Sequence, residues 1–182
     1  TPNPSYEDVS SGSVKAREAV ELVYDKSKIN INDILERYFT HIDPTDKEGE
    51  FADRGHQYTP AIYYTTEYQS VKAKDIIAKI NASKKFDLPV AVEVLPYTNF
   101  YNAEEYHQDY KDKNPVRYSA YREASGRNNF VKIHWQDGST TTREVFMDSA
   151  PLSAQASTTS TTTKKKWNDR SEEHTSELQS LT

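Results

Sequence analysis

The chain has 182 residues, with 23 Lys and Arg against 28 Asp and Glu and no Cys, and only 35% of its residues are hydrophobic. This length predicts one domain; the net charge of −5 argues against a nucleic-acid partner, and no apolar run approaches the ~18 residues that a membrane span needs. The absence of Cys excludes disulfides, thiolate metal ligands and a thiol nucleophile within these residues.

The first predicted elements are a strand and a helix. Apolar and polar residues alternate over 18–24, as in a strand with one buried face. Apolar residues then recur at helical spacing over 30–40, and Asn30 or Asn32 is the expected N-cap. Pro44 follows this helix, and Pro disfavours helical geometry in the residue before it, so the helix ends there.

A second set of elements follows. In chain order it comprises an acidic loop at 43–55, an aromatic strand at 60–64, a helix ending near residue 84, a strand at 89–95 and a short helix at 103–110. Thr65 or Thr66 is the expected cap of the long helix. Its predicted inward face consists of Val71, Ile77, Ala78 and Ile80. Since strands and helices alternate, the predicted class is α/β or α+β in two layers.

The composition changes at Ser139. Of the last 44 residues, 18 are Ser or Thr, which leaves too little apolar surface to offset the entropy of ordering. Residues 170–180 resemble a translated sequencing adapter. We therefore expect a domain over 1–138 and a disordered, non-native tail over 139–182.

Several polar residues are candidates for chemistry. Tyr6 and Tyr58 lie at loops or element ends, where a hydroxyl can donate to a ligand or the ring can simply pack. Glu18 precedes a strand, and a partly buried carboxyl can serve as a proton donor, whereas a solvated one has no such role. The acidic loop suggests calcium, but its spacing lacks the alternating pattern of a calcium loop.

A series of motifs carries a family resemblance. In order, these are Asn3-Pro-Ser-Tyr6, Arg17-Glu18-Ala-Val, His41-Ile-Asp-Pro44, Asp53-Arg-Gly-His-Gln-Tyr58, Ala61-Ile-Tyr-Tyr64 and Phe100-Tyr-Asn-Ala-Glu-Glu-Tyr-His-Gln108. Together they resemble peptide methionine sulfoxide reductase A, which reduces the S epimer of methionine sulfoxide. The resemblance covers residues 1 to about 135. Residues 118–127 are similar to the C-terminal extension of some members.

The resemblance implies a fold and a set of site residues. The fold would be an α+β two-layer sandwich with a ferredoxin-like core, a mixed sheet and flanking helices, lacking its first strand and helix here. Glu18 would protonate the sulfoxide oxygen, and Tyr6 and Tyr58 would steady it. Asp53 would help to hold the site and its water. The four residues before Glu18 depart from the family's Thr-Gly-His-Ala, which affects how Glu18 is aimed.

The resemblance also implies what lies outside these residues. The family's nucleophilic Cys sits in a G-C-F-W-G motif at a helix start, where the thiolate is favoured. That motif is expected before Thr1, so the chain is interpreted as an N-terminally truncated, inactive fragment of a protein-repair oxidoreductase. A non-catalytic methionine-sulfoxide-binding module is one alternative, and an acid–base hydrolase is another.

The same resemblance implies partners and surroundings. We expect substrates to be oxidised proteins or peptides, and thioredoxin or another external thiol to be the reductant. No bound cofactor, metal, nucleic acid or membrane is expected. We also expect the protein to be a monomer and to be located in the cytoplasm.

Overall fold

The computed structural model describes residues 4, 8–9, 11–136, 145–146 and 162–166, the last five as backbone alone. Its elements, in chain order, are β1 (Ala19–Val23), α2 (Ile31–Phe39), β2 (Gly49–Glu50), β3 (Asp53–Arg54), the 3-10 turn η1 (His56–Tyr58), β4 (Ala61–Tyr64), α3 (Glu67–Ser83), β5 (Glu93–Pro96), the 3-10 turn η2 (Glu105–His107), α4 (Tyr110–Lys113), α5 (Pro115–Ala124), α6 (Arg127–His134) and β6 (Thr162–Lys166). Among the described residues, no helix is both long and apolar enough to cross a bilayer.

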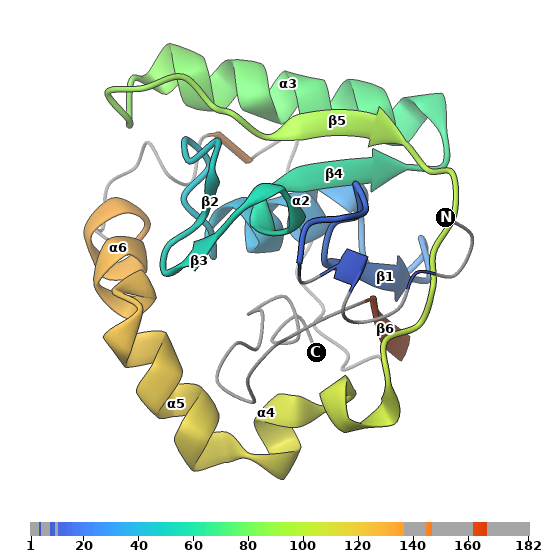
Figure 1. Ribbon diagram of the computed structural model, residues 1–182. Helices are drawn as coiled ribbons and strands as arrows, with labels where there is room; N and C mark the ends of the chain where they lie inside the picture. Colours follow the sequence, from blue (N-terminus) through green and yellow to red (C-terminus); the bar gives the residue numbers. More distant parts are fainter. Residues whose placement is uncertain (1–3, 5–7, 10, 137–144, 147–161, 167–182) are drawn as a thin grey trace.

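The α/β class is confirmed by this alternation of strands and helices. The described strands form three two-stranded sheets: β1 with β6, β2 with β3, and β4 with β5. The β4–β5 pair is parallel and the other two pairs are antiparallel. In Figure 1, β5, β4 and β1 follow one another down the molecule with α3 along one side. The expected mixed sheet is thus divided, because β1 and β4 are separate in the hydrogen-bonding pattern.

Both long helices begin with reciprocal caps. The side chain of Asn30 accepts from the backbone N–H of Asp33 at 3.1 Å, and the Asp33 carboxylate accepts from the N–H of Asn30 at 3.2 Å. Thr66 and Gln69 make the same exchange at the start of α3. These capping boxes satisfy backbone donors that the first turn leaves free. Asn30 and Thr66 are therefore the caps, rather than Asn32 or Thr65.

The core lies between α2, α3 and α6. Its largest fully buried members include Phe39, Ile76 and Ile80. On α3 the prediction was right for Ile80 and for the half-buried Ile77, but wrong for Val71 and Ala78, which are exposed. The helix instead buries a narrow stripe, formed by Ser70, Ala73, Ile76 and Ile80. This stripe has the helical repeat and leaves the intervening apolar side chains facing solvent.

Two other predicted elements differ in extent. The strand expected at 89–95 is confined to β5, because the N–H of Val90 donates to the Asn81 side chain at 2.9 Å and that of Ala91 donates to the Pro44 carbonyl at 2.7 Å. These contacts occupy backbone N–H groups that would otherwise donate to a neighbouring strand. The helix expected at 103–110 is the short turn η2, and α4 begins only at its last residue.

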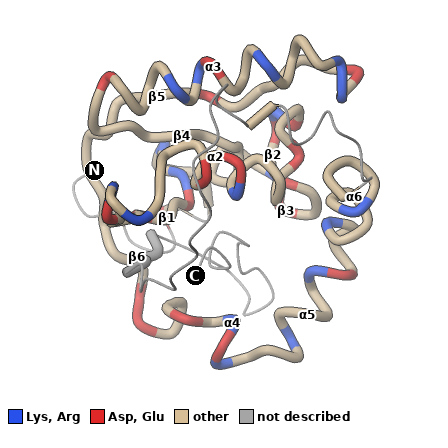
Figure 2. Tube along the Cα trace, turned by 180° about the vertical axis from the view of Figure 1, so that it is seen from behind, with Lys and Arg blue, Asp and Glu red and all other residues tan. Residues whose placement is uncertain are grey.

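The last helices form an arm that the sequence patterns did not indicate. In Figure 1, α4 lies at the bottom, and α5 runs up from it to α6, which lies on the side of β2 and β3. Val131 of α6 and Trp135 just after it are buried in the core. Lys and Arg are interspersed with Asp and Glu along the arm (Figure 2). Gly126 joins α5 to α6 at φ +83°, a conformation that favours glycine.

Parts of the expected tail are described. Val145 and Phe146 are buried in the core, with the ring of Phe146 centred 6.4 Å from that of Phe39. Residues 162–166 form β6, whose backbone pairs with β1. Both segments lie within the stretch expected to be a disordered tail, an expectation that stays a prediction. The rest of the tail lies outside the described residues, so the boundary at 138 stays a prediction.

Candidate functional site

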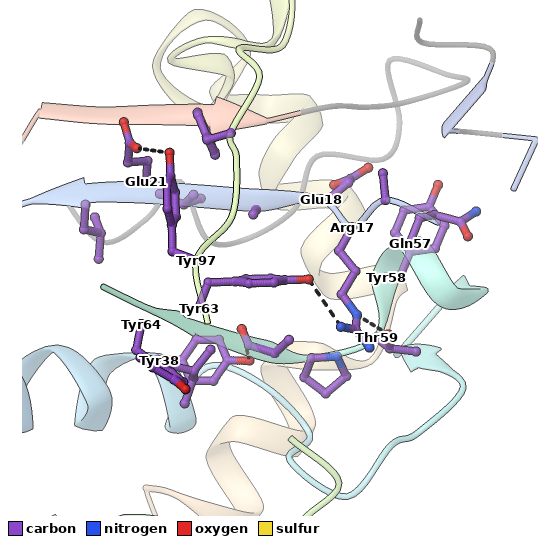
Figure 3. Close-up of a pocket in the computed structure, with 18 of the residues that line it drawn as sticks. Arg17, Glu18, Glu21, Tyr38, Gln57, Tyr58, Thr59, Tyr63, Tyr64 and Tyr97 are labelled. Atoms are coloured by element: carbon purple, nitrogen blue, oxygen red, sulfur yellow. Dashed lines mark hydrogen bonds between the residues drawn. The ribbon is translucent and has the colours of Figure 1, made fainter. Parts of the chain in front are cut away.

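A cavity of about 740 Å³ lies between β1 and β4 and continues toward β3 and the start of α6. Its lining includes Glu18, Asp53 and Tyr58, so three of the four sequence-predicted site residues meet there. Figure 3 shows Glu18 and Tyr58 at one end of this space, with Tyr63 between β1 and β4. Tyr6, the fourth, lies outside the described residues.

Glu18 is held by its backbone. Its N–H donates to the carbonyl oxygen of Gln57 at 2.9 Å, which fixes the entry to β1 beside η1 and therefore beside Tyr58. The Glu18 side chain is half-buried and points away from that of Arg17, as successive residues of an extended chain do (Figure 3). The contact places a carboxyl and a phenol at the same end of the cavity.

Arg17 occupies the opposite side of the same backbone. It is buried, with Nε donating to Thr59 Oγ1 at 2.8 Å and Nη1 to the Tyr63 hydroxyl at 3.3 Å, and it pairs with Glu93. Burial works to lower the pKa of Arg17, but the bonds to Tyr63 and Glu93 outweigh it and raise the pKa above its ordinary value. A permanent cation thus ties β1 to β4 and β5 next to Glu18.

Asp53 comes from a very tight hairpin. The pair β2–β3 has two residues in each strand, and a Cβ at Gly49 would lie 2.2 Å from the Asp53 carbonyl oxygen, so only glycine fits. The Asp53 side chain is buried and accepts a hydrogen bond from the Tyr121 hydroxyl at 2.7 Å. Burial, and then the bond to Asp53, raise the pKa of Tyr121, which keeps this phenol a donor.

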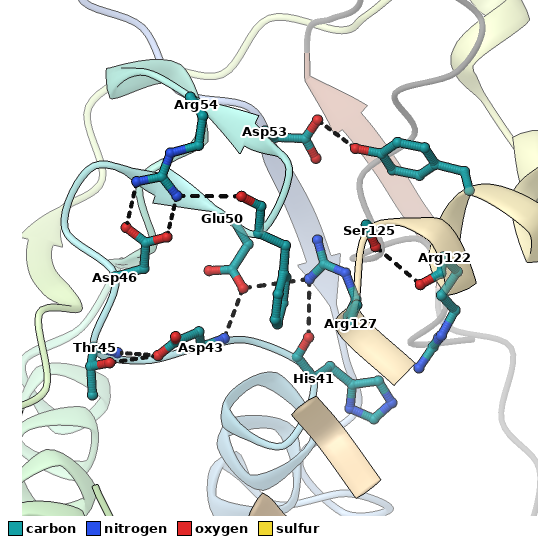
Figure 4. A network of polar contacts seen from close by, with 12 residues as sticks. His41, Asp43, Thr45, Asp46, Glu50, Asp53, Arg54, Arg122, Ser125 and Arg127 are labelled. Carbon is teal, nitrogen blue, oxygen red and sulfur yellow. Dashed lines mark hydrogen bonds and ion pairs between the residues drawn. The ribbon is translucent and has the colours of Figure 1, made fainter. Parts of the chain in front are cut away.

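Glu50 is a second buried carboxyl on the hairpin. Its Oε1 accepts from the N–H of Asp43 at 2.7 Å and lies 3.6 Å from Nη1 of Arg127, as Figure 4 shows. Burial raises the pKa of Glu50 to about 8, although the charge of Arg127 and the Asp43 N–H act in the other direction. The same carboxyl affects Tyr38. Burial, and then the charge of Glu50, raise the pKa of Tyr38.

The acidic loop has protein partners for its carboxylates. Asp46 pairs with Arg54, whose Nη2 donates to Asp46 Oδ1 at 3.0 Å, and Asp43 accepts from Thr45 (Figure 4). Burial works to raise the pKa of Asp46, but the bond to Arg54, the charge of Arg54 and the backbone N–H groups of Glu48 and Gly49 together lower it. Within the described residues there is no group of three or more His, Asp or Glu arranged to hold a metal ion.

Comparison with known proteins decides the family. The family model for peptide methionine sulfoxide reductase matches residues 1–139. The chain belongs to the peptide methionine sulfoxide reductase family. Enzymes of this family reduce methionine sulfoxide, so the resemblance carried by the motifs is confirmed, together with the oxidoreductase and protein-repair assignment.

Individual relatives agree. The chain is 43% identical over 133 residues to peptide methionine sulfoxide reductase MsrA 2 of Staphylococcus aureus, covering 73% of this chain and 75% of that protein. It is 44% identical over 135 residues to MsrA of Bacillus licheniformis, covering 74% and 75%. Methionine sulfoxide reductase A of Corynebacterium diphtheriae superposes with a TM-score of 0.56 at 30% identity, over 64% of this chain and 59% of that structure.

The sequence patterns did not single out three cavity neighbours of the MsrA site. Arg17 and Arg127 line the cavity and are buried, and Tyr121 contacts it through Asp53. An arginine immediately before a strand of alternating apolar residues is a signal that could have marked Arg17, because a cation there needs a partner. No local pattern marks Tyr121, whose partner lies 68 residues earlier.

Proposed function

We propose that this reductase chain holds the sulfoxide oxygen of a methionine sulfoxide side chain and supplies the proton that the oxygen needs as it is transferred. One observation carries the proposal: Glu18 just before β1, Asp53 in β3 and Tyr58 in η1 line the same cavity. Glu18 is the proton donor, and Tyr58 donates a hydrogen bond to the oxygen, with Tyr6 in the same role. Asp53 orders the polar side of the site.

The proposed chemistry balances with a thiolate. The thiolate sulfur attacks the sulfoxide sulfur, the oxygen passes to the thiol sulfur, and one proton is taken up, so that a thioether and a sulfenic acid result. Fixed donors around the oxygen stabilise the charge that develops there. A second thiol then forms a disulfide with release of water, and an external dithiol such as thioredoxin restores the thiols.

The 182 residues contain no Cys, so the attacking thiolate must come from elsewhere. We therefore propose that residues 1–182 bind the sulfoxide but do not reduce it. Purified chain incubated with dithiothreitol and a methionine sulfoxide peptide should yield no methionine. Turnover by these residues alone would contradict the proposal. Fusion of a family segment carrying G-C-F-W-G ahead of Thr1 should produce reduction of the S epimer, and its Cys-to-Ser form should not.

Binding tests the assigned roles directly. Calorimetry with matched peptides containing S-sulfoxide, R-sulfoxide and methionine should give binding of the S epimer only. Glu18→Gln and Tyr58→Phe should each weaken it about tenfold, the upper end of the net value of one neutral hydrogen bond. Tyr68→Phe is the control, since Tyr68 is 61% exposed on α3. Equal binding of all three peptides would show that the cavity does not recognise the sulfoxide.

The remaining parts of the proposal concern the substrates, the reductant, the cofactor requirement, the oligomeric state and the cellular location. Oxidised proteins or peptides are the substrates, consistent with the family. Regeneration by thioredoxin, action without a bound cofactor, a monomeric state and a cytoplasmic location are proposed from the family resemblance. Gel filtration with light scattering and a coupled thioredoxin assay on the fused, Cys-bearing form test the first three.

A further inference from the structure

The arm formed by α4, α5 and α6 reaches the polar side of the cavity through one residue of α5. The hydroxyl of Tyr121, near the end of α5, donates to Asp53 Oδ1 at 2.7 Å. The phenol belongs to α5, whereas the carboxylate belongs to β3 of the hairpin. The bond joins segments 68 residues apart, so it depends on how the arm is placed.

Arg127 fixes the arm beside the hairpin. Its side chain is 4% exposed, its Nη1 donates to the carbonyl oxygen of His41 at 3.1 Å, and its guanidinium lies 4.3 Å from the centre of the Phe51 ring. Nη1 also lies 3.6 Å from Glu50 Oε1. Buried cation contacts of this kind are costly to leave unmade, so the start of α6 is firmly seated.

Asp53 needs such external support. Its own strand has two residues, and a two-stranded pair of this length is not stable by itself. A hydrogen bond to one oxygen of a carboxylate on this strand restricts the rotation of the side chain. Tyr121 supplies such a hydrogen bond as a half-buried donor from α5.

We infer that Tyr121 is a positioning residue of the reductase site, which holds one oxygen of Asp53 so that the carboxylate faces the cavity. The inference rests on the proposed function, since it concerns the aim of a residue of that site. Tyr121 is not among the residues that line the cavity, and it reaches the site through its hydrogen bond to Asp53. The arm is therefore part of the substrate-recognition machinery and not only a C-terminal support.

The test compares Tyr121→Phe with Tyr118→Phe in the full 182-residue chain. Tyr118 lies one turn earlier on α5, is 5% exposed, and its hydroxyl has no hydrogen-bond partner among the described residues. Calorimetry with the S-sulfoxide peptide should show binding weakened about three- to tenfold by Tyr121→Phe. Tyr118→Phe should leave binding unchanged. Far-ultraviolet circular dichroism of both variants should match that of the unaltered chain.

The outcomes separate the two proposals. If the unaltered chain binds the peptide and Tyr121→Phe binds it equally well, the role of Tyr121 is wrong and the proposed function stands. If the unaltered chain binds no sulfoxide peptide, the proposed function falls and the role of Tyr121 with it.

A second measurement does not depend on the variant's folding. In the unaltered chain labelled with ¹³C-tyrosine, the Cζ resonance of Tyr121 should move when the peptide binds, and that of Tyr118 should not. A Tyr121 resonance that stays fixed at saturation would overturn the inference.

Discussion

Substitution of Glu50 by Gln should make the protein more stable at alkaline pH. Burial raises the pKa of Glu50 from 4.5 to about 8. A carboxyl whose folded-state pKa is raised favours the folded protein when protonated. Its contribution is fully present below pH 4.5 and is lost as the pH rises to about 8. Gln is neutral at every pH and keeps an oxygen that can accept from the N–H of Asp43.

The magnitude follows from the size of the shift. One pKa unit corresponds to about 1.4 kcal/mol, so the rise from 4.5 to about 8 corresponds to about 5 kcal/mol at most. Between pH 5 and pH 8 the part that is lost is about 3 to 4 kcal/mol. The charged groups around Glu50 are Arg127, Asp43 and Asp46. All three are unchanged by the substitution, so their own titration largely cancels between the two proteins.

The assay is urea unfolding followed by circular dichroism at pH 5, 6, 7, 8 and 9. The free energy of unfolding of Glu50→Gln minus that of the unaltered chain should grow by about 3 to 4 kcal/mol from pH 5 to pH 8. Glu48→Gln is the matched control: it lies on the same hairpin with a side chain 74% exposed and should give a flat difference. If Glu50→Gln instead destabilises the protein at pH 8, Glu50 is ionised in a favourable pair with Arg127 and the reasoning is refuted.

Three further substitutions, one with a matched control, test the packing and capping of the elements around the site. Gly49→Ala should cost about 1–3 kcal/mol in urea unfolding and weaken sulfoxide-peptide binding, because its Cβ would meet the Asp53 carbonyl oxygen at 2.2 Å; unchanged binding would show that the hairpin does not place Asp53. Phe39→Ala should cost about 3–5 kcal/mol, since the ring is fully buried, while Val71→Ala, at 53% exposure, should cost under about 0.5 kcal/mol. Thr66→Ala removes a cap from α3 and should lower unfolding free energy by about 1 kcal/mol, measured the same way; a null effect would mean that the capping box contributes nothing.

Sequence patterns correctly predicted the features that depend on residues close together in the chain, such as the starts of the two long helices. The α2 and α3 helices begin at Asn30 and Thr66 because the capping residues lie three positions from their partners, within reach of a sequence pattern. Val71 was misplaced because two apolar stripes fit the same helical period, and only the position of the core decides between them. The strand expected at 89–95 was shortened by contacts with Pro44 and Asn81, which no local window contains.

The residues of the candidate site likewise fall into those that the sequence predicted and those that it did not. Glu18, Asp53 and Tyr58 were identified from motifs that resemble a family, and the structure places them around one cavity. Arg17 and Tyr121 were not identified, because their significance lies in partners far along the chain. The partner of Arg17 at Glu93 is 76 residues away. A resemblance transfers residues that relatives share, whereas the groups that orient them depend on this chain's own packing.

Phe51 shows why the hairpin and the arm must be considered together. Its φ of 55° is left-handed, a conformation that costs a non-glycine residue about 1–2 kcal/mol. The ring offsets this cost through an edge contact with Phe130 at 5.3 Å between centroids and through the guanidinium of Arg127 above its face. Both partners belong to α6. The bend that presents Asp53 is therefore stabilised from the arm, two residues before the carboxylate that Tyr121 holds.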